Sequence, residues 1–333
     1  MLGVIKKNVR CFVYLSVQSE VNSHDISLFE MLSSLSINYS LERCLVGFEF
    51  DKTSMYMMPV NFGPSVGPRR KPDGKRFIYD NPTKTDRYGV VYEVEDLKQL
   101  EALLPEGMTL KAPYLIVAVD YLSDIAWLGK KQYAVMTCNI PVRVKSDEGN
   151  LKGFFMPCIW ENEIDPIITG REQLGYCKIP CEIDPPQREG NKVTIRIAEY
   201  GNEFLKLEIE PGKLPNHILK FLFAINQGDG IFHYKYMPRA IAPFDEPEVN
   251  CLCFSPRKFK MPEDFSTKGH PKGFTKLGRG TAKWTALTWE QSPCHYQIIK
   301  TLSNIKITRF LGSVNMQLYS VNDYYYQRII KRY

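Results

Sequence analysis

Short strand-forming segments dominate the chain from about residue 87 onward, and this pattern constrains the fold more than any other. They are rich in Val, Ile, Tyr and Phe and are bounded by Gly, Pro, Asn or Asp, which is typical of β-strands. The expected strands cover residues 87–94, 114–121, 132–144, 153–160, 192–199, 204–209 and 282–289. The expected helices cover residues 94–104, 165–174, 215–225 and 323–330. Many strands with few helices predict an α+β, β-rich fold, with helices flanking a closed β-barrel.

The first 54 residues have a different pattern from the rest of the chain. Residues 26–46 place apolar side chains at helical spacing, and residues 23–25 offer polar caps. We therefore expect a partly helical N-terminal extension over residues 1–54, followed by one domain over residues 55–333. Three interpretations of the extension are open: an appended helix, an oligomer contact, or a misassigned start with one of the methionines of residues 55–58 as initiator.

Composition indicates a globular protein. The 333 residues can bury a substantial core, and a content of 44% hydrophobic and 12% aromatic residues argues against disorder. No segment approaches the roughly 18 apolar residues that span a bilayer. Polar residues interrupt the apolar run at the N-terminus, and no small-residue cleavage site follows, so it is a poor signal peptide. We expect a cytoplasmic protein without a membrane partner.

Nine cysteines are scattered through the chain, an odd number that favours reduced thiols over a disulfide framework. Two pairs, Cys177 with Cys181 and Cys251 with Cys253, together offer four thiols to a zinc ion. Neither spacing is that of the usual C-x-x-C motif, and no histidine is close in sequence. We therefore expect no metal site and no cofactor.

The net charge of +6 is modest, and its densest basic segment is GPRRKPDGKR, residues 67–76. A nucleic-acid-binding surface would continue such a segment along a helix or interleave it with aromatic residues, and the sequence does neither. Prolines and glycines indicate a solvated loop that attracts an anionic substrate. We expect no nucleic-acid partner.

One lysine stands in apolar company. The segment GREQLGYCKIPC places Lys178 among Tyr176, Cys177, Ile179 and Pro180. Burial disfavours a charged ammonium and favours the free amine, which is the form that attacks a carbonyl carbon. In the alternative interpretation Lys178 merely ends a strand and its ammonium reaches water. The local pattern leaves both interpretations open.

The segment GREQLGYCKIP resembles the sequence around the Schiff-base lysine of the acetoacetate decarboxylase family. In that family a G-R-E helix end leads through an aromatic residue to a P-K-K run, whose first lysine is the nucleophile. Further motifs follow the family's order: MMPVNFGPSVGPR (57–69), VVYEVEDLKQLEALLPEGMTL (90–110), NIPVRV (139–144), LPNHILK (214–220) and GRGTAKWTALTW (278–289). The resemblance covers about residues 55–333. It implies a cone-like closed barrel, with Lys178 as the nucleophile.

The resemblance also implies a reaction. Neutral Lys178 condenses with a ketone, the iminium accepts the electron pair as carbon dioxide departs, and the enamine is protonated and hydrolysed. The expected function is Schiff-base decarboxylation of acetoacetate or a related larger β-keto acid, by a homo-oligomer that needs no cofactor. Two alternatives are open: aldolase- or dehydratase-type chemistry through the same iminium, and a non-catalytic barrel that binds a small ligand.

Four residues near Lys178 are candidates for the site. Arg171 and Glu172 match the family's G-R-E, and are expected either to fix the turn that delivers the lysine or to contact substrate. If the strand is extended, Tyr176 shares a face with Lys178 and walls its pocket, or else it is an ordinary core aromatic. Met156 aligns with an apolar active-site strand of the family, or is plain core.

Departures from the family pattern favour a shifted substrate. Ile179 stands where decarboxylases carry a second lysine, so desolvation would have to activate the nucleophile. Val135 stands where the family's Y-x-E segment carries an acid. Arg87 is only an approximate counterpart of a substrate-binding arginine. Asp120 is the acid nearest to the position of another family glutamate.

Overall fold

The computed structural model describes residues 49–77, 83–146, 149–212, 228–243, 245–256, 275–320 and 324–333. The fold below is that of the compact unit Thr53–Tyr333. The helices expected over residues 26–46 and 215–225 lie outside the described residues, and the N-terminal extension over residues 1–54 stays a prediction. None of the helices in these ranges is both long and apolar enough to cross a membrane.

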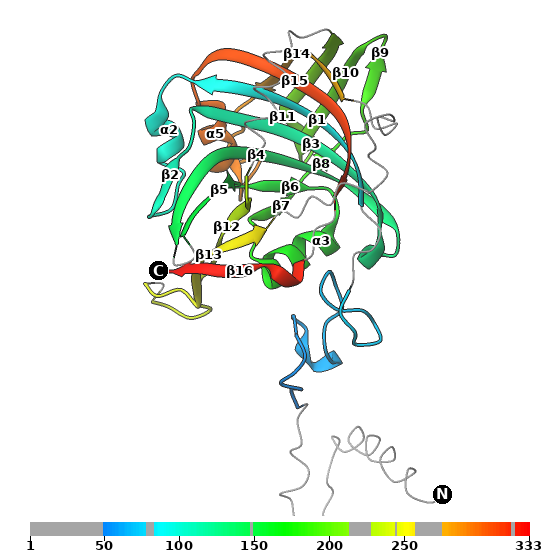
Figure 1. Ribbon diagram of the computed structural model, residues 1–333, viewed down its shortest axis with the longest axis vertical. Helices are drawn as coiled ribbons and strands as arrows, with labels where there is room; N and C mark the ends of the chain where they lie inside the picture. Colours follow the sequence, from blue (N-terminus) through cyan, green and yellow to red (C-terminus); the bar gives the residue numbers. More distant parts are fainter. Residues whose placement is uncertain are drawn as a thin grey trace, which may run out of the picture. The chain divides into compact units, whose positions relative to one another are not determined.

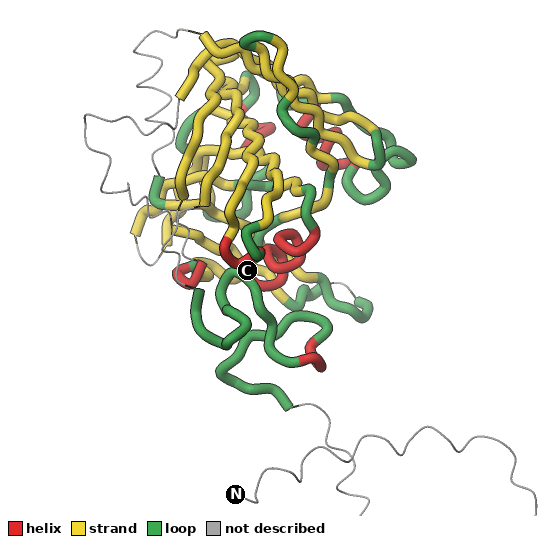
Figure 2. Tube along the Cα trace, turned by 90° about the vertical axis from the view of Figure 1, so that its right-hand side faces the viewer, coloured by secondary structure: helices red, strands yellow, loops and turns green. Residues whose placement is uncertain are grey.

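Sixteen strands form one sheet, whose long members are bent and twisted as strands of L-residues prefer to be (Figures 1 and 2). The strands are β1 (Thr83–Val94), β2 (Met108–Leu110), β3 (Tyr114–Ile125), β4 (Lys131–Ser146), β5 (Gly149–Phe155), β6 (Ile159–Glu161), β7 (Lys178–Pro180), β8 (Glu182–Ile183), β9 (Gln187–Glu189), β10 (Lys192–Glu199), β11 (Asn202–Gly212), β12 (Gly230–Met237), β13 (Val249–Pro256), β14 (Thr275–Trp284), β15 (Ile307–Ser320) and β16 (Arg328–Arg332).

The sheet follows the order β16-β13-β12-β5-β4-β3-β1-β15-β14-β11-β10-β8, with β2 and β6 also on β4, β7 on β6, and β9 on β10. The β12–β5 and β6–β7 pairs are parallel. Strand β4 changes partners on both edges near Ile140, from β3 and β6 to β2 and β5. Strand β4 thereby joins the strands on either side of this exchange in one sheet.

The predicted closure of the barrel is not confirmed. Within the described ranges the terminal strands of the path, β16 and β8, are not paired with each other. Strand β7 is hydrogen-bonded to β6, and strand β8 is hydrogen-bonded to β10. Strands β7 and β8 are not paired with each other in the described residues; they are joined only through Cys181, the residue between them in the sequence. A covalent link thus replaces a ladder of hydrogen bonds at this position, while the β-rich fold with few helices agrees with the prediction.

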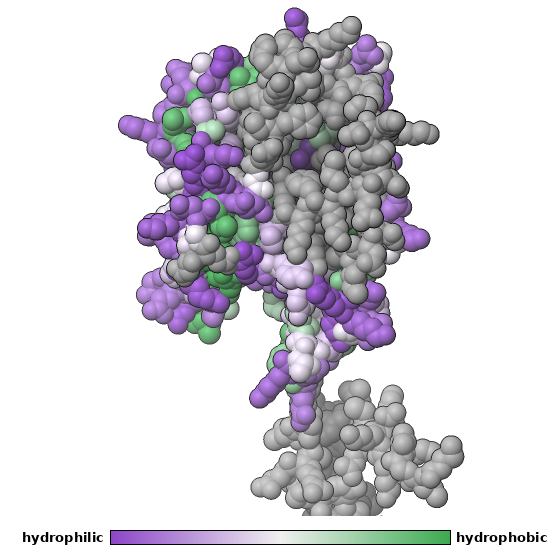
Figure 3. Space-filling view, viewed as in Figure 1, coloured by the Kyte–Doolittle hydropathy of each residue, from purple (hydrophilic) through white to green (hydrophobic). Residues whose placement is uncertain are grey.

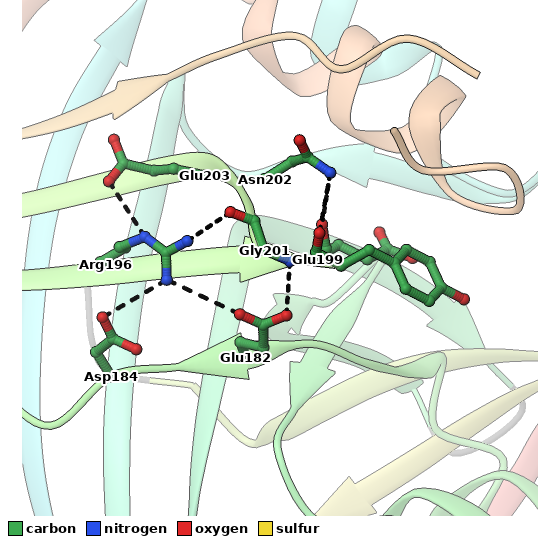
Figure 4. Close-up of polar contacts among 8 residues, drawn as sticks. Glu182, Asp184, Arg196, Glu199, Gly201, Asn202 and Glu203 are labelled. Atoms are coloured by element: carbon green, nitrogen blue, oxygen red, sulfur yellow. Dashed lines mark hydrogen bonds and ion pairs between the residues drawn. The ribbon is translucent and has the colours of Figure 1, made fainter. Parts of the chain in front are cut away.

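An exposed charge cluster holds β8 on the sheet. Figure 4 shows Arg196 of β10 between Glu182, Asp184 and Glu203, at 3.7–3.8 Å from their carboxylate oxygens, and Nη2 also donates to the carbonyl of Gly201 at 2.7 Å. Single exposed pairs stabilise little, but several acids around one guanidinium form a network. The network orients the short strand that follows β7.

The main core lies on one face of the sheet. Because side chains alternate along a strand, Val90 and Tyr92 of β1 point into it while Arg87 and Gly89 point to the other face. Trp160 is fully buried in this core, with its ring centroid 5.4 Å from that of Phe204 and 6.2 Å from that of Trp284. Hydrophilic side chains cover most of the coloured surface in Figure 3.

Helical segments are short. They are η2 (Val60–Phe62), α2 (Leu97–Glu101), η3 (Ala126–Leu128), α3 (Ile164–Thr169), η4 (Gly170–Leu174), α5 (Tyr296–Ser303) and η5 (Tyr324–Tyr326). The helix expected over residues 165–174 is α3 continued by η4, a single π-helical turn. The helix expected over residues 323–330 is wrong, because η5 leads directly into β16, which pairs with β13.

Candidate active site around Lys178

A sharp turn positions Lys178. Turn η4 ends at Gly175, whose φ of +74° favours glycine, and Lys178 is then the first residue of β7. Arg171 Nη1 donates to the carbonyl of Lys178 at 2.9 Å. A Cβ on Gly170 would lie 2.4 Å from Cδ of Lys178, so the absence of a side chain there makes room for the lysine.

The lysine is enclosed. Lys178 is 8% exposed, and its Nζ lies 2.8 Å from Oε1 of Glu161 and donates to the carbonyl of Pro166 at 3.0 Å. The rings of Tyr176 and Tyr133 have their centroids 5.4 and 6.0 Å from Nζ. The ammonium therefore does not reach water, in contrast to the alternative interpretation of the sequence.

Glu161 is the acid at this lysine, and it was not among the residues expected from the sequence. Its side chain is 1% exposed, and Oε2 has no hydrogen-bond partner in the part of the chain that the structure describes. Burial raises the pKa of Glu161, and the charge of Lys178 opposes that shift. Burial thus favours the protonated form of this carboxyl group over that of an exposed one. An acid directly after an expected buried strand was the signal available in the sequence.

An apolar wall adjoins the lysine. Met156 packs with Val135 and Ile159, and the rings of Tyr133 and Tyr176 lie against this group. The hydroxyl of Tyr176 is 3.0 Å from Oγ of Ser255 on β13. Met156 and Tyr176 are thus brought to the lysine's side of the sheet. Burial raises the pKa of Tyr176, so its phenol stays protonated.

Glu172 and Arg87 lie elsewhere. Oε2 of Glu172 accepts a long hydrogen bond of 3.4 Å from the backbone N–H of Met58. Arg87 on β1 donates two hydrogen bonds of 2.7 Å to Asp120, and this pairing occupies the guanidinium. Arg87 also lines a small cavity on the face of the sheet opposite the main core. This cavity has a volume of about 30 Å³ and room for roughly one or two water molecules.

The family model for acetoacetate decarboxylase (ADC) matches residues 58–264, more than half of the chain. The chain belongs to the acetoacetate decarboxylase family. Comparison with curated proteins gives no match. The acetoacetate decarboxylase of Legionella pneumophila subsp. pneumophila str. Philadelphia 1 has a similar structure, with a TM-score of 0.56 and 18% identity over 79% of this chain and 93% of that chain.

Two further solved structures share the fold. A second acetoacetate decarboxylase has a TM-score of 0.53 and 13% identity over 79% of this chain and 95% of that chain. The enduracididine biosynthesis enzyme MppR, complexed with the condensation product of pyruvate and imidazole 4-carboxaldehyde, has a TM-score of 0.52 and 14% identity over 81% of this chain and 99% of that chain. At these identities the likeness shows the fold.

Strand register relates the acids of this acetoacetate decarboxylase family member. Arg87 is paired with Asp120, Asp120 with Val135, and Val135 with Glu161, in one row across β1, β3, β4 and β6. Paired residues point to the same face of a sheet. Glu161 therefore lies directly opposite Val135, the position at which the sequence departs from the family's acid.

The next positions along the strands place Lys178 and its neighbour Ile179. Lys178 is paired with Ile159, and so shares the face of the acids, whereas Ile179 is paired with Trp160 and packs against the main core. A lysine at position 179 would put a charge against that core, which is costly. The isoleucine thus suits the packing of this family member.

His233 on β12 is the second residue that the sequence analysis missed. It is fully buried, and neither ring nitrogen has a hydrogen-bond partner among the described residues. Burial, reinforced by the charge of Lys178, lowers the pKa of His233 well below its usual value, so the ring is neutral. No strand was expected over β12, although its Ile, Phe and Tyr residues are typical of a β-strand and were the signal available in the sequence.

Proposed function

We propose that the chain is a Schiff-base enzyme that decarboxylates a β-keto acid, acetoacetate or a larger relative, with Lys178 as the nucleophile. The enclosed contact of 2.8 Å between Lys178 and Glu161 is the observation that carries this proposal. A carboxyl group whose pKa burial raises can take the proton of a neighbouring ammonium. That transfer leaves the free amine without help from a second lysine.

The proposed steps use only the chain's own residues and the substrate. The amine of Lys178 attacks the ketone carbon, and Glu161 returns its proton to the carbinolamine hydroxyl, which leaves as water. The bond to the carboxylate then breaks, and its electron pair moves to the iminium nitrogen as carbon dioxide departs. Protonation of the enamine carbon and hydrolysis of the imine release the ketone and restore the amine. This mechanism requires no cofactor.

A condensation is the second candidate reaction. The enamine carbon that accepts a proton in decarboxylation can instead attack an aldehyde, and the complex of MppR contains such a condensation product of pyruvate. The altered acid pattern, with Val135 facing Glu161, favours a shifted substrate for this chain. Aldolase- or dehydratase-type chemistry is therefore an alternative to decarboxylation. A non-catalytic barrel that binds a small ligand is the other alternative.

Reductive trapping separates these functions. The protein is incubated with acetoacetate, longer β-keto acids or pyruvate, treated with borohydride, and digested, and the peptide containing Lys178 is weighed. An adduct with release of carbon dioxide supports decarboxylation, whereas an adduct without it supports the condensation. Absence of an adduct with every substrate supports the ligand-binding barrel. The Lys178→Arg variant is the control, because a guanidinium does not lose its proton in proteins.

Two further proposals rest on the family resemblance. These are a homo-oligomer and a catalytic domain over residues 55–333. We also infer a cytoplasmic protein, from the poor match of the N-terminus to a signal peptide and the odd number of cysteines. Sedimentation of the full chain and of a chain beginning at Met55 compares their oligomeric states. A change in mass ratio between the two would assign an oligomer contact to residues 1–54.

A further inference from the structure

The buried imidazole of His233 faces the candidate site. Ile231 of β12 packs against the apolar wall that includes Met156, and His233, two residues along the strand, points to the same face. Its ring centroid lies 3.7 Å from that of Tyr176, whose ring in turn lies 5.4 Å from Nζ of Lys178. The ring of Tyr176 thus lies beside both the imidazole of His233 and Nζ of Lys178.

The polar groups around His233 are already engaged with one another. The hydroxyl of Tyr176 contacts Ser255. Cys253, the cross-strand partner of His233, has its Sγ 3.8 Å from that of Cys251. Lys178 is bound to Glu161. Both imidazole nitrogens are left without a partner in this described region, although buried polar groups in proteins are as a rule hydrogen-bonded.

Packing alone does not explain a histidine here. A phenylalanine would fill the same space against Tyr176 and would bring no polar atoms into the interior. A neutral imidazole differs from it by one N–H donor and one acceptor nitrogen. A hydroxyl group also has one donor and acceptor lone pairs, so the two groups match each other.

We propose that His233 binds a hydroxyl substituent of the substrate, on the carbon chain beside the Schiff-base carbon. The proposal rests on the proposed function, since it places the substrate on Lys178. It narrows the substrate class to hydroxylated keto compounds. His233 would then be a specificity-determining residue whose unpaired nitrogens gain partners only in the complex.

Two ketones that differ by one oxygen test the proposal. 4-Hydroxybutan-2-one and butan-2-one are trapped on Lys178 by borohydride over a range of concentrations, with the wild-type chain and the His233→Phe variant. We expect the wild type to be half-saturated by the hydroxyketone at a concentration about tenfold lower than by butanone, the value of one net hydrogen bond. In His233→Phe this preference disappears, and the two ketones half-saturate the variant at about equal concentrations.

Half-saturation of the wild type by both ketones at the same concentration would overturn the inference. So would a variant in which both half-saturation concentrations rise by the same factor, because the preference for the hydroxyketone would then not depend on His233. Failure of the wild type to trap either ketone would instead contradict the proposed function. If His233→Phe does not fold, the ¹⁵N signals of the five histidines in the wild type serve in its place. The hydroxyketone should shift the signal of His233 and butanone should not, with His295, which is bound to Glu199, as the reference. Identical shifts with both ketones contradict the hydroxyl contact.

Discussion

Lys178 and Glu161 form an ion pair of 2.8 Å whose members are both shut off from solvent. Each charge loses its hydration on burial, and the mutual attraction seldom repays this by much. A pair of this kind is thus a poor way to stabilise a fold. We infer that the pair serves the proposed chemistry of the amine instead.

Removing the whole pair is therefore expected to leave the protein at least as stable as the wild type. The Lys178→Met/Glu161→Leu variant replaces it with apolar side chains of similar size, whereas Glu161→Leu alone leaves a buried ammonium and costs about 3–5 kcal/mol. Urea unfolding measures both. Lys192 and Glu208 are also 2.8 Å apart, but both are partly open to solvent, and they supply the control pair. Glu208→Gln should leave the midpoint nearly unchanged. A double variant as unstable as the single one would assign the pair to the fold.

Alanine at Gly170 is expected to impair Lys178, the proposed nucleophile, without unfolding the chain. The helical backbone at this position accepts alanine, but the new Cβ would collide with Cδ and Cε of Lys178. The lysine must then leave Glu161, and trapping by borohydride should slow by about tenfold or more, the usual scale of general acid–base catalysis. Gly212→Ala is the matched control, because a Cβ there meets nothing within 4 Å. Wild-type trapping by Gly170→Ala would argue against the observed lysine position.

The stability conferred by Glu161 should fall as the pH rises. Burial raises its pKa in the folded chain above the unfolded value of 4.5, so the folded state holds the proton more tightly. This contribution is present below the unfolded pKa and is lost as the pH rises through the folded pKa. Relative to Glu161→Gln, which does not titrate, the wild type is expected to lose free energy of unfolding over that range. Denaturation of both proteins at a series of pH values checks this, and a constant difference would refute it.

Moving the acid across one strand should preserve the chemistry. Glu161→Val alone is expected to slow trapping by about 100-fold, because the proton acceptor is lost. In Val135→Glu/Glu161→Val the carboxyl group sits on the paired residue of β4, on the same face, and most of the trapping rate should return. Val135→Glu alone puts two acids opposite each other and should lower the urea midpoint. A swapped variant no faster than Glu161→Val would show that the acid acts only from β6.

Local signals account for what the sequence could predict. Strands β1, β3, β4 and β10 were expected nearly as they occur, because their runs of β-branched and aromatic residues are continuous. The strand expected over residues 153–160 is divided between β5 and β6 around Pro157, which cannot donate to a ladder. The helix expected over residues 323–330 failed because β16 depends on β13, more than 70 residues earlier, for its hydrogen bonds.

In the candidate site, too, the residues set by local sequence could be predicted and those set by strand pairing could not. Lys178 could be found because its motif is contiguous and glycines mark the turn before it. Glu161 and His233 reach it through the register of β4, β6 and β12, which no local pattern records. Arg87 points to the same face of the sheet as Glu161, but it is bound to Asp120. Asp120 lies on β3, two strands away from β6.

Strand β7 is three residues long, and its first two side chains serve opposite sides of the sheet. Lys178 faces the acids while Ile179 packs beside Trp160 in the core. A substitution deep in the core can therefore shift the amine without touching any residue around it. We therefore expect natural variation at Trp160 or Ile179 to be limited by the proposed reaction as well as by folding, and homologues that repack this core to differ also in the compounds they accept.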